Sequence, residues 1–564
     1  MTEVRQNTKY VFILLVLSYF FFMFGNGVVS LSNPDEVFYA QTAREMAKHA
    51  SWLTPYLFDT PNFEKPIFLY WLLRIGFILF GVSSFAARFF PAVFAALGVV
   101  AVYYLGLFGF KNSRKAFFSA LVLMSSGLYI GLARTVFTDM VFSIFILFSL
   151  VSFFWAYTYK EKKDVGILLF FVSLGFAVLT KGPLGLFIPT LTVLTFLIIR
   201  KDIKWIFCKC SLWGLFVFIL ISFPWYVFMI AKYGNAFTHE FFYNDHIRRI
   251  LEAEHAINDT WFFYPLSMFG GMFPWSLYVI VSLGYSFKNL RRNSESLSIF
   301  LTCWILVVLC IFQPAHSKLA SYIFPLFPAL AMVTGNFVFN VATSQKKPRS
   351  LFYISIITAL VFVIILIGLG VNMTIFSKYI RTYLSSSLSV YILFGLLSIL
   401  TVSFFVLILK HKFVQSIFVL MCVIPAVFCI IPVISRDIEP FISSKDTCAY
   451  LFKNYKVDNT LLCSKFFVRG LRYYTDKPVA VIAPYTKNFF SPHPIPFLDS
   501  DQKVAEFLRK QSVTYCVFKK SSIEDIERIA KQEFDFAILK TIGNEYILKV
   551  QPLKKKPGHN AARN

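Results

Sequence analysis

Ionisable and hydroxyl-bearing side chains of this chain gather in short clusters that separate long apolar runs. A charge at membrane depth is costly to keep there, so such clusters are candidate functional sites. Lys and Arg side chains in such clusters can bind a phosphate-bearing lipid and stabilise negative charge that develops in a reaction. Carboxylates beside them can act as a base or as a substrate ligand. The candidates are Asp35, Glu36, Tyr39, Glu64, Lys65, Arg134, Asp139, Lys181, His246, Arg249, Lys318 and Tyr322.

Asp35 illustrates the alternatives that the sequence leaves open. Asn33 can cap a helix, Pro34 suits the first helical position, and Glu36 sits where a capping-box acid belongs. One interpretation makes Asp35 a charge that compensates the helix dipole. The other makes it a carboxylate held at the membrane edge as a base or substrate ligand, on a helix that also carries Tyr39.

Other clusters have structural alternatives as well. Glu64 and Lys65 fit either a surface ion pair or a lysine held at headgroup depth by the proline that follows it. Arg134 and Asp139 fit either a structural ion pair or two site residues in a short turn between spans. Lys181, in a Lys-Gly-Pro turn, fits an interfacial anchor when it is taken alone.

A long polar loop, residues 232–261, contains His246 and Arg249 between two apolar runs. A solvated loop is the structural interpretation of this segment. The spacing between His239 and His246 is only a weak indication of a metal site. The sequence therefore indicates no cofactor and leaves a divalent metal open.

Composition excludes several classes of protein. Of the 564 residues, 57% are hydrophobic and only 15% are charged, whereas a soluble protein carries about 25% charged residues. The net charge of +25 is spread over short clusters between apolar runs, which is typical of membrane topology signals and not of nucleic-acid binding. Nine cysteines without a CxxC pair indicate neither a disulfide framework nor a zinc cluster.

Apolar runs of about 20 residues predict helices that cross a bilayer. Thirteen are expected: 10–31, 88–108, 116–131, 137–157, 165–179, 184–199, 205–230, 262–283, 297–312, 319–339, 351–371, 390–409 and 413–434. Arg5 and Lys9 precede the first run, which predicts a cytoplasmic N-terminus.

Basic residues test the sidedness of these spans. Every second connection is short and rich in Lys and Arg, namely 111–115, 160–163, 200–204, 288–292, 346–349 and 410–412. Cytoplasmic loops have this composition, so the candidate residues and everything after residue 434 are expected outside, in the periplasm of a Gram-negative cell. If residues 66–81 also crossed the membrane, all later basic connections would fall on the outer side. Their central Arg74 also favours an interfacial or re-entrant helix.

The last part of the chain has another composition. Strand-length apolar runs at 460–463, 479–483, 514–518, 536–539 and 546–550 alternate with amphipathic helical patterns at 501–510 and 523–531. This alternation predicts a small α/β domain. The expected organisation is an α-helical membrane domain over 1–434, with outer juxtamembrane helices near 34–81, and an α/β domain over 435–564.

Several motifs in the membrane part carry a resemblance to a known family. They are Asp35-Glu36 after the first span, Phe63-Glu64-Lys65-Pro66 with Tyr70-Trp71, Arg134 with Asp139-Met140, Thr180-Lys181-Gly182, Asp245-His246-Ile247-Arg248-Arg249, Pro274-Trp275, and Ser317-Lys318-Leu319 with Tyr322. Over roughly residues 10–330 the chain resembles bacterial polyprenyl-phosphate-dependent glycosyltransferases of the glycosyltransferase-C fold. The most similar type is the lipid A aminoarabinose transferase, related to protein O-mannosyltransferases.

The resemblance implies a reaction and its partners. Such enzymes transfer a sugar from a polyprenyl phosphate carrier to an acceptor outside the inner membrane. The implied donor is an undecaprenyl-phosphate-linked sugar, and the implied acceptor is lipid A or another periplasmic molecule. Membrane lipids are further expected partners, and no nucleic acid is. A protein O-mannosyltransferase and a lipid-linked sugar transporter or flippase are the alternatives.

The resemblance also implies roles for single residues. Asp35 and Asp139 are the expected catalytic carboxylates, and Lys65 and Arg249 are expected to hold the carrier phosphate. Lys318 and Tyr322 are expected to line the same cavity, with Glu36, Tyr39, Glu64, Arg134, Lys181 and His246 as further substrate-binding residues. The family commonly has Glu where this chain has Asp245 and Phe where it has Ile250.

Overall fold

The computed structural model describes residues 2–252, 256–290, 295–344, 349–375, 387–483, 494–530 and 533–553. Parts of the predicted loop 232–261 and of the basic clusters 288–292 and 346–349 lie outside these residues. The chain folds as two compact units: residues 1–28, 51–55 and 62–434 form the first, and residues 29–50, 56–61 and 435–564 form the second. The sequence had placed residues 29–50 with the membrane domain.

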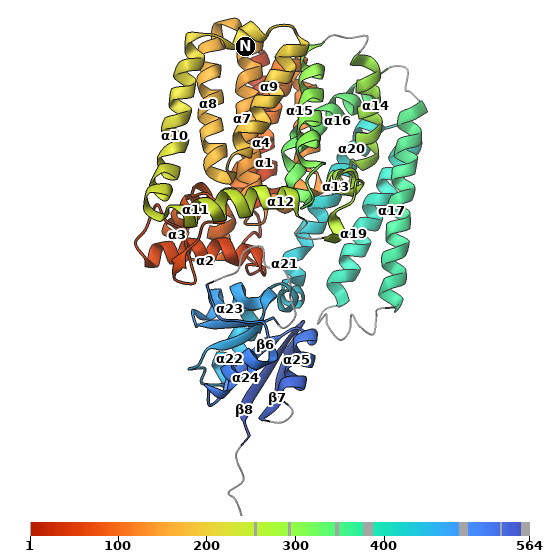
Figure 1. The fold of residues 1–564 in the computed structure, drawn as a ribbon. Helices are drawn as coiled ribbons and strands as arrows, with labels where there is room; N and C mark the ends of the chain where they lie inside the picture. The colour runs from red at the N-terminus through yellow and green to blue at the C-terminus, as the bar shows by residue number, and fades with distance from the viewer. Residues whose placement is uncertain are drawn as a thin grey trace, which may run out of the picture. The chain divides into compact units, whose positions relative to one another are not determined.

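The first unit is a bundle of apolar helices (Figure 1). They are α1 (Thr2–Ser18), α3 (Phe68–Phe80), α4 (Ser84–Phe110), α5 (Ser113–Met124), α6 (Gly127–Ala133), α7 (Thr138–Thr158), α8 (Lys163–Lys181), α9 (Leu184–Ile199), α10 (Lys209–Tyr233), α11 (Asn235–Thr238), α12 (Arg248–Leu251), α13 (Phe263–Gly271), α14 (Ser276–Leu290), α15 (Ser296–Phe312), α16 (Phe327–Thr343), α17 (Arg349–Ile375), α19 (Ser387–Leu409) and α20 (Phe413–Met421). The first unit also contains a π-helix, η4 (His239–Ile247), and a 3-10 helix, η6 (Ala320–Leu326). Helix α21 (Val423–Ile442) continues from the first unit into the second.

Length and apolarity make the chain a multi-pass membrane protein. Among the described residues seven helices are long and apolar enough to cross a membrane, or up to nine if each of two bent pairs is one span. Helices α9 and α15 match predicted spans, but with 16 and 17 residues they are shorter than the about 20 residues that a spanning helix needs. The predicted total of thirteen spans therefore stays a prediction.

Two predicted spans are bent helix pairs in the structure. The run 116–131 forms α5 and α6 at 67°, and the run 262–283 forms α13 and α14 at 113°. Between α13 and α14, Pro274 has no backbone N–H to donate and disfavours helical backbone at the residue before it. Between α5 and α6, the Ser125 and Ser126 hydroxyls donate to the carbonyls of Leu121 and Val122, a pattern that often bends helices.

Helix α3 is the segment that the sequence assigned to an interface. It has 13 residues, too few to cross a bilayer core of about 30 Å at 1.5 Å per residue. Its Arg74 is 8% exposed, donates to the Ser51 carbonyl and stacks over the Trp52 ring at 3.7 Å from the centroid. The charge is thus accommodated by neighbouring groups, and the interfacial placement stays a prediction.

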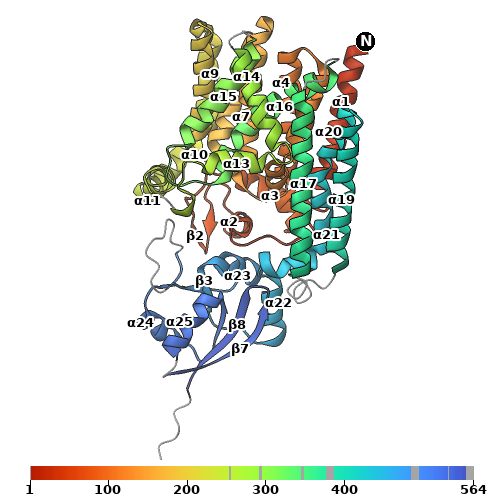
Figure 2. The ribbon, with the colours of Figure 1, turned by 90° about the vertical axis from the view of Figure 1, so that its right-hand side faces the viewer.

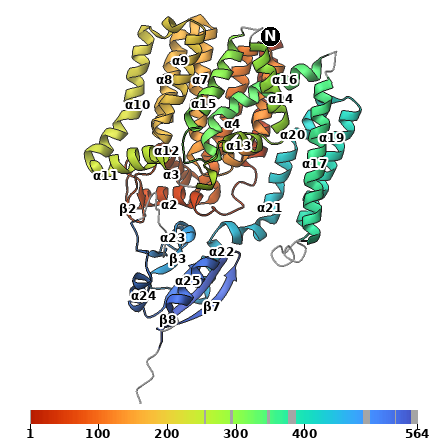
Figure 3. The ribbon, with the colours of Figure 1, turned by 45° about the vertical axis from the view of Figure 1, so that its right-hand side comes forward.

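Helix direction separates the candidate residues from the basic connections. Helix α7 begins beside Asp139 and ends before Lys160, while α8 runs back from Lys163 to Lys181 (Figure 1). Helices α11 and α12 cross the bundle at the end where α10 finishes, and the N-terminus lies at the other end (Figure 3). Helices α17 and α19 pack side by side away from α7 (Figure 2).

The second unit contains a six-stranded mixed sheet. Its strands are β3 (Leu461–Ser464), β4 (Val479–Ile482), β5 (Phe497–Leu498), β6 (Thr514–Phe518), β7 (Phe534–Ile542) and β8 (Glu545–Pro552), in the order β5-β4-β3-β6-β8-β7. The consecutive pairs β5–β4, β4–β3 and β3–β6 are parallel, and β8 pairs antiparallel with β6 and β7. The helices are α2 (Asp35–Lys48), α22 (Lys445–Asn454), α23 (Val468–Thr475), α24 (Asp501–Arg509) and α25 (Lys520–Ala530).

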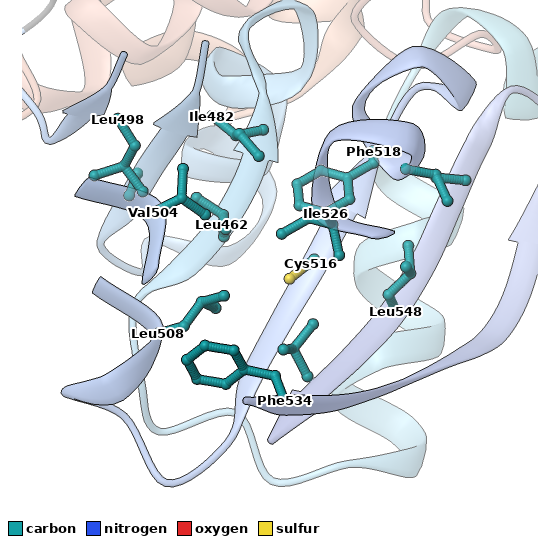
Figure 4. Close-up of a cluster of buried hydrophobic side chains, with 13 residues drawn as sticks. Leu462, Ile482, Leu498, Val504, Leu508, Cys516, Phe518, Ile526, Phe534 and Leu548 are labelled. Carbon is teal, nitrogen blue, oxygen red and sulfur yellow. The ribbon is translucent and has the colours of Figure 1, made fainter. Parts of the chain in front are cut away.

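Helices on both faces bury this sheet. All four residues of β3 and of β4 are buried, as expected for parallel strands covered on two sides. On one face, side chains of β3, β4, β6 and β8 meet Val504, Leu508 and Ile526 of α24 and α25 (Figure 4). The predicted fold class, a helical membrane domain with an α/β domain, is confirmed.

Candidate functional site

Asp245 joins two of the predicted cations in the first unit. Its carboxylate lies 2.5 Å from the Lys65 Nζ and 3.2 Å from the Arg249 Nε. Lys65 also donates to the Glu64 carbonyl at 3.1 Å. The Asp245 side chain is only 8% exposed, so the pairing takes place away from bulk water, where charges interact strongly.

Local helical structure explains the pairing of Asp245 with Arg249. The two residues are four apart in η4 and α12, a spacing that places side chains on one helix face. Burial alone would raise the pKa of Asp245, but the charges of Lys65 and Arg249 outweigh burial and hold it below its ordinary value. Asp245 is therefore ionised, and it orients both cations.

Tyr322 connects this group to a second ion pair. The Arg249 guanidinium donates to the Tyr322 hydroxyl at 3.1 Å, and the Lys181 Nζ lies 5.0 Å from the centroid of the Tyr322 ring. Lys181 donates to Asp139 Oδ1 at 2.6 Å. Together these residues form the site cluster: Lys65, Asp245, Arg249, Tyr322, Lys181 and Asp139.

Lys181 and Asp139 come together because of helix direction. Asp139 lies in the first turn of α7 and Lys181 in the last turn of α8, and these antiparallel helices pack against each other. A carboxylate at a helix N-terminus and a cation at a helix C-terminus are each favoured by the helix dipole. Lys181 is therefore part of a partly buried ion pair, which the anchor interpretation did not predict.

The site cluster has an excess of positive charge. Its three cations outnumber its two carboxylates. A phosphate that approached Lys65 and Arg249 would meet donors already oriented by Asp245, which avoids reorganisation on binding. The arrangement can thus hold an anionic ester and stabilise charge that grows on it.

His246 supports the turn that carries Lys181. Its Nδ1 hydrogen-bonds to the Phe241 carbonyl at 2.7 Å, which fixes the ring proton on Nδ1 because a carbonyl only accepts. Burial lowers the pKa of His246 below its ordinary value, with Asp245 opposing the effect. A Cβ on Gly182 would lie 2.8 Å from the His246 Nε2. His246 is therefore a neutral ring packed against this turn.

Lys318 is held by a residue that the sequence did not single out. Its Nζ donates to Asp259 Oδ1 at 2.7 Å, and His316 Nδ1 lies 2.7 Å from Asp259 Oδ2. These two contacts lower the pKa of Asp259, with Lys318 as the larger cause. The backbone N–H of Ser317 donates to the Arg249 carbonyl at 3.1 Å, which ties the Lys318 segment to the site cluster.

Arg134 and Glu64 complete the candidates of the first unit. Arg134 follows α6, donates to the Phe21 carbonyl at 3.2 Å and lies 5.6 Å from the centroid of the Phe428 ring. The backbone N–H of Glu64 donates to the Asn62 side chain at 3.2 Å.

The remaining three candidates belong to the second unit. Helix α2 begins at Asp35, one residue later than predicted, with Pro34 as its N-cap residue. Glu36 accepts from the backbone N–H and hydroxyl of Ser32 at 3.0 and 2.9 Å, and Tyr39 is buried with its ring 5.0 Å from that of Phe38.

Asp35 itself keeps contact with water. Its side chain is 53% exposed and lies 3.9 Å from the Arg469 guanidinium. The approach of Asp35 to the site cluster stays a prediction.

Two residues important for this geometry were missed as site residues. Asp245 stood in a quoted motif, and its spacing to Arg249 was a usable signal. Asp259 gave no such signal, because only the fold brings it to Lys318. Within the described residues no group of three or more His, Cys, Asp or Glu side chains is placed to hold a metal ion.

Comparison with known proteins places the chain among glycosyltransferases. A family model described as dolichyl-phosphate-mannose-protein mannosyltransferase matches residues 7–238. The undecaprenyl phosphate-alpha-4-amino-4-deoxy-L-arabinose arabinosyl transferase 2 of Proteus mirabilis is 30% identical over 360 residues, 62% of this chain and 64% of that protein. The corresponding enzyme of Photorhabdus laumondii is 31% identical over 54% of this chain and 55% of its own length. The chain thus spans less than two thirds of these relatives.

An uncharacterised protein of Aquifex aeolicus is 30% identical over 364 residues, 64% of this chain and 70% of that protein. The chain belongs to this glycosyltransferase family. A solved structure of the family, ArnT from Cupriavidus metallidurans bound to undecaprenyl phosphate, superimposes with a TM-score of 0.76. The match covers 96% of this chain and 98% of that one at 19% identity, which shows a shared fold.

Proposed function

We propose that this family member moves an aminosugar, such as 4-amino-4-deoxy-L-arabinose, from undecaprenyl phosphate to lipid A. The reaction takes place on the periplasmic face of the bacterial inner membrane. The observation that carries the proposal is the site cluster, in which Asp245 holds Lys65 and Arg249 side by side; these are the two cations proposed to bind the carrier phosphate. Relatives named as arabinosyl transferases supply the identity of the sugar.

The proposed reaction is a single displacement at the anomeric carbon of the donor sugar. An oxygen of the acceptor forms the new glycosidic bond while the bond from that carbon to the carrier phosphate oxygen breaks. The electron pair of the broken bond stays on undecaprenyl phosphate, whose negative charge grows. Lys65 and Arg249 stabilise this charge, an effect worth about 2.7–4 kcal/mol for each well-placed donor. The displacement inverts the anomeric centre.

The role of the carboxylates depends on the acceptor. A hydroxyl acceptor needs a base, and a carboxylate within hydrogen-bond range supplies one. A lipid A phosphate is already ionised near pH 7 and needs none. Asp35 and Asp139 then orient the acceptor or pair with the amino group of the sugar.

Sidedness rests on the direction of the helices. The site cluster and the basic connections 160–163 and 200–204 lie at opposite ends of α7, α8 and α9. Because Lys- and Arg-rich connections face the cytoplasm, the site cluster is assigned to the periplasmic side.

The test is a transfer assay in lipid vesicles with the lipid-linked aminosugar and lipid A. We expect lipid A to gain the mass of one aminosugar. Lys65→Ala should lower transfer by about 10²-fold or more, because one donor to the leaving phosphate is lost. Asp35→Asn and Asp139→Asn should each abolish transfer with normal protein levels. The matched control is Lys503→Ala, which removes a lysine from an exposed pair with Asp499 and should be fully active.

A second candidate is a protein O-mannosyltransferase, which the family match over residues 7–238 favours. Under this alternative, the lipid-linked sugar would be mannose and periplasmic proteins would gain its mass. Lipid A would keep its mass. Full activity of both Asp35→Asn and Asp139→Asn would refute the site for either enzyme. A labelled sugar that crosses the membrane and stays on its carrier would indicate a transporter.

A further inference from the structure

Helix α2, which carries Asp35, folds with the last part of the chain. Residues 29–50 and 435–564 belong to one compact unit, and α2 packs against α23. Arg469 of α23 lies 3.9 Å from the Asp35 carboxylate, and its guanidinium lies 4.4 Å from the centroid of the Phe38 ring. One residue of the C-terminal domain thus touches the proposed catalytic carboxylate and the helix surface beside it.

A second contact holds the far end of α2. Arg472 of α23 is 6% exposed and lies 3.4 Å from Glu45, which is 1% exposed, and it also binds Asp59. Removing one partner of such a buried pair leaves the other charge uncompensated. Helix α2 is therefore fastened to α23 near both of its ends.

A hydrogen-bond chain fixes the residues that enter α2. The Asn33 side-chain amide donates to the Ser444 hydroxyl at 2.7 Å, and this hydroxyl donates to Glu545 at 2.6 Å. The backbone N–H of Asn33 donates to the Ile442 carbonyl at 2.7 Å. Ser444 precedes α22 without capping it, so its hydroxyl serves the contact between distant parts of the chain.

Close packing surrounds this entry and leaves no room for a side chain at residue 470. A Cβ on Gly470 would lie 1.9 Å from the Asn33 Oδ1. The Tyr474 hydroxyl donates to the Leu31 carbonyl at 3.0 Å. Residues 442–444 at the junction of α21 and α22, together with α23 and β8, therefore define where the chain turns into α2, two residues before Asp35.

We propose that the C-terminal α/β domain positions Asp35 for transfer, with Arg469 and the chain Asn33–Ser444–Glu545 as its positioning residues. The inference rests on the proposed function, because it gives the domain a task in that reaction. Ser444 and Glu545 act through α2 and need not touch a substrate. A displacement of about 1 Å at a reacting group can lower a rate by about 10²-fold, so a loosened entry to α2 lowers kcat.

The test compares Ser444→Ala with Ser500→Ala in the full-length protein. Ser500 lies in the same domain and caps α24 by accepting from the Lys503 N–H, so its loss is structural only. We expect Ser444→Ala to raise hydrogen–deuterium exchange over residues 33–48 and to lower kcat by about 10-fold to 100-fold. The KM for the lipid-linked donor should be unchanged. Ser500→Ala should leave exchange in α2 and kcat at the wild-type values.

A conservative pair at Glu545 completes the test. Glu545→Gln keeps an oxygen that accepts from Ser444 and should retain wild-type exchange and kcat, whereas Glu545→Ala should resemble Ser444→Ala. Wild-type exchange in α2 of Ser444→Ala would overturn the inference, as would equal loss of kcat in Ser500→Ala. A wild-type protein without transfer activity would refute the proposed function instead, and the exchange result would still decide whether the domain holds α2.

Discussion

At the scale of single residues, Asp245 determines the geometry of the site cluster. Lys65 comes from the segment before α3 and Arg249 from α12, and one buried carboxylate holds both. The group of two cations and one carboxylate has a net positive charge, and the carboxylate keeps both cations oriented. Under the proposed function, a substrate phosphate would bind without the cost of bringing two flexible side chains together.

The variant Asp245→Asn tests this role. The amide cannot balance two partly buried cations, so we expect a loss of about 3–5 kcal/mol in the free energy of unfolding. The matched control is Asp499→Asn, whose partner Lys503 lies 2.9 Å away in an exposed pair, where solvent screening leaves little effect on stability. Unfolding followed in detergent measures both. Similar losses of unfolding free energy in the two variants would show that Asp245 is not needed to balance the charges of Lys65 and Arg249.

Sequence patterns predicted single residues better than their partners. Lys65, Arg249 and Tyr322 were predicted for one pocket, and the structure brings them together. Asn33 was predicted to cap α2, but its side chain donates to Ser444 instead. A buried hydroxyl from a segment more than 400 residues away along the chain competes with local capping, and local patterns carry no information on such a partner.

At the scale of elements, the turn between α8 and α9 sets the place of Lys181. Gly182 has φ +84° and ψ −154°, a conformation that is essentially restricted to glycine. It lets the chain reverse immediately after Lys181 while His246 packs against the turn. The turn and the loop around His246 therefore fit together only without a side chain at residue 182.

Gly182→Ala and Gly81→Ala form a matched pair for this turn. Gly81 has φ +73° and ψ 167° at the end of α3, and a Cβ added there would have no atom within 4 Å, so both variants carry the same strain, about 1–3 kcal/mol. Only Gly182→Ala also meets His246 and Phe241, at 2.8 and 3.0 Å. We expect a larger fall in melting temperature and a loss of transfer for Gly182→Ala alone. Equal effects on both quantities would contradict the role of this contact.

Elements of regular composition were predicted closely. The run 514–518 is strand β6, and the pattern 501–510 is helix α24 to within one residue. The bent run 262–283 was predicted as one span, because hydropathy counts apolar residues and does not detect a change of helix direction at Pro274. Helix α23 is short and carries two arginines, so apolar runs gave no signal for it.

At the scale of the whole molecule, a buried carboxyl gives the second unit a dependence on pH. Burial raises the pKa of Glu545 from 4.5 to about 7, against the opposing hydrogen bond from Ser444. The folded state therefore binds this proton more tightly than the unfolded chain does. Its contribution to stability is complete below about pH 4.5 and is lost as the pH rises to about 7.

Glu545→Gln should remove this dependence, because a glutamine side chain stays neutral at every pH. In the wild type we expect the free energy of unfolding of the second unit to fall by roughly 3 kcal/mol over this range. The measurement is thermal unfolding of both full-length proteins at about pH 5 and about pH 8. A wild-type melting temperature that rises between these two pH values would contradict the assignment to Glu545. So would an equal change of melting temperature with pH in the wild type and in Glu545→Gln.

Helix α2 is synthesised long before the C-terminal residues that it contacts in the folded protein. Ribosomes produce residues 29–50 early, yet their partners Arg469, Ser444 and Glu545 follow only after the membrane helices have been made. Under the proposed function, the nascent protein is therefore expected to lack transfer activity until these partners of α2 have been made, even when Lys65 and Arg249 are already inserted. Completion of strand β8, which supplies Glu545, is then the last step in assembling these contacts around α2.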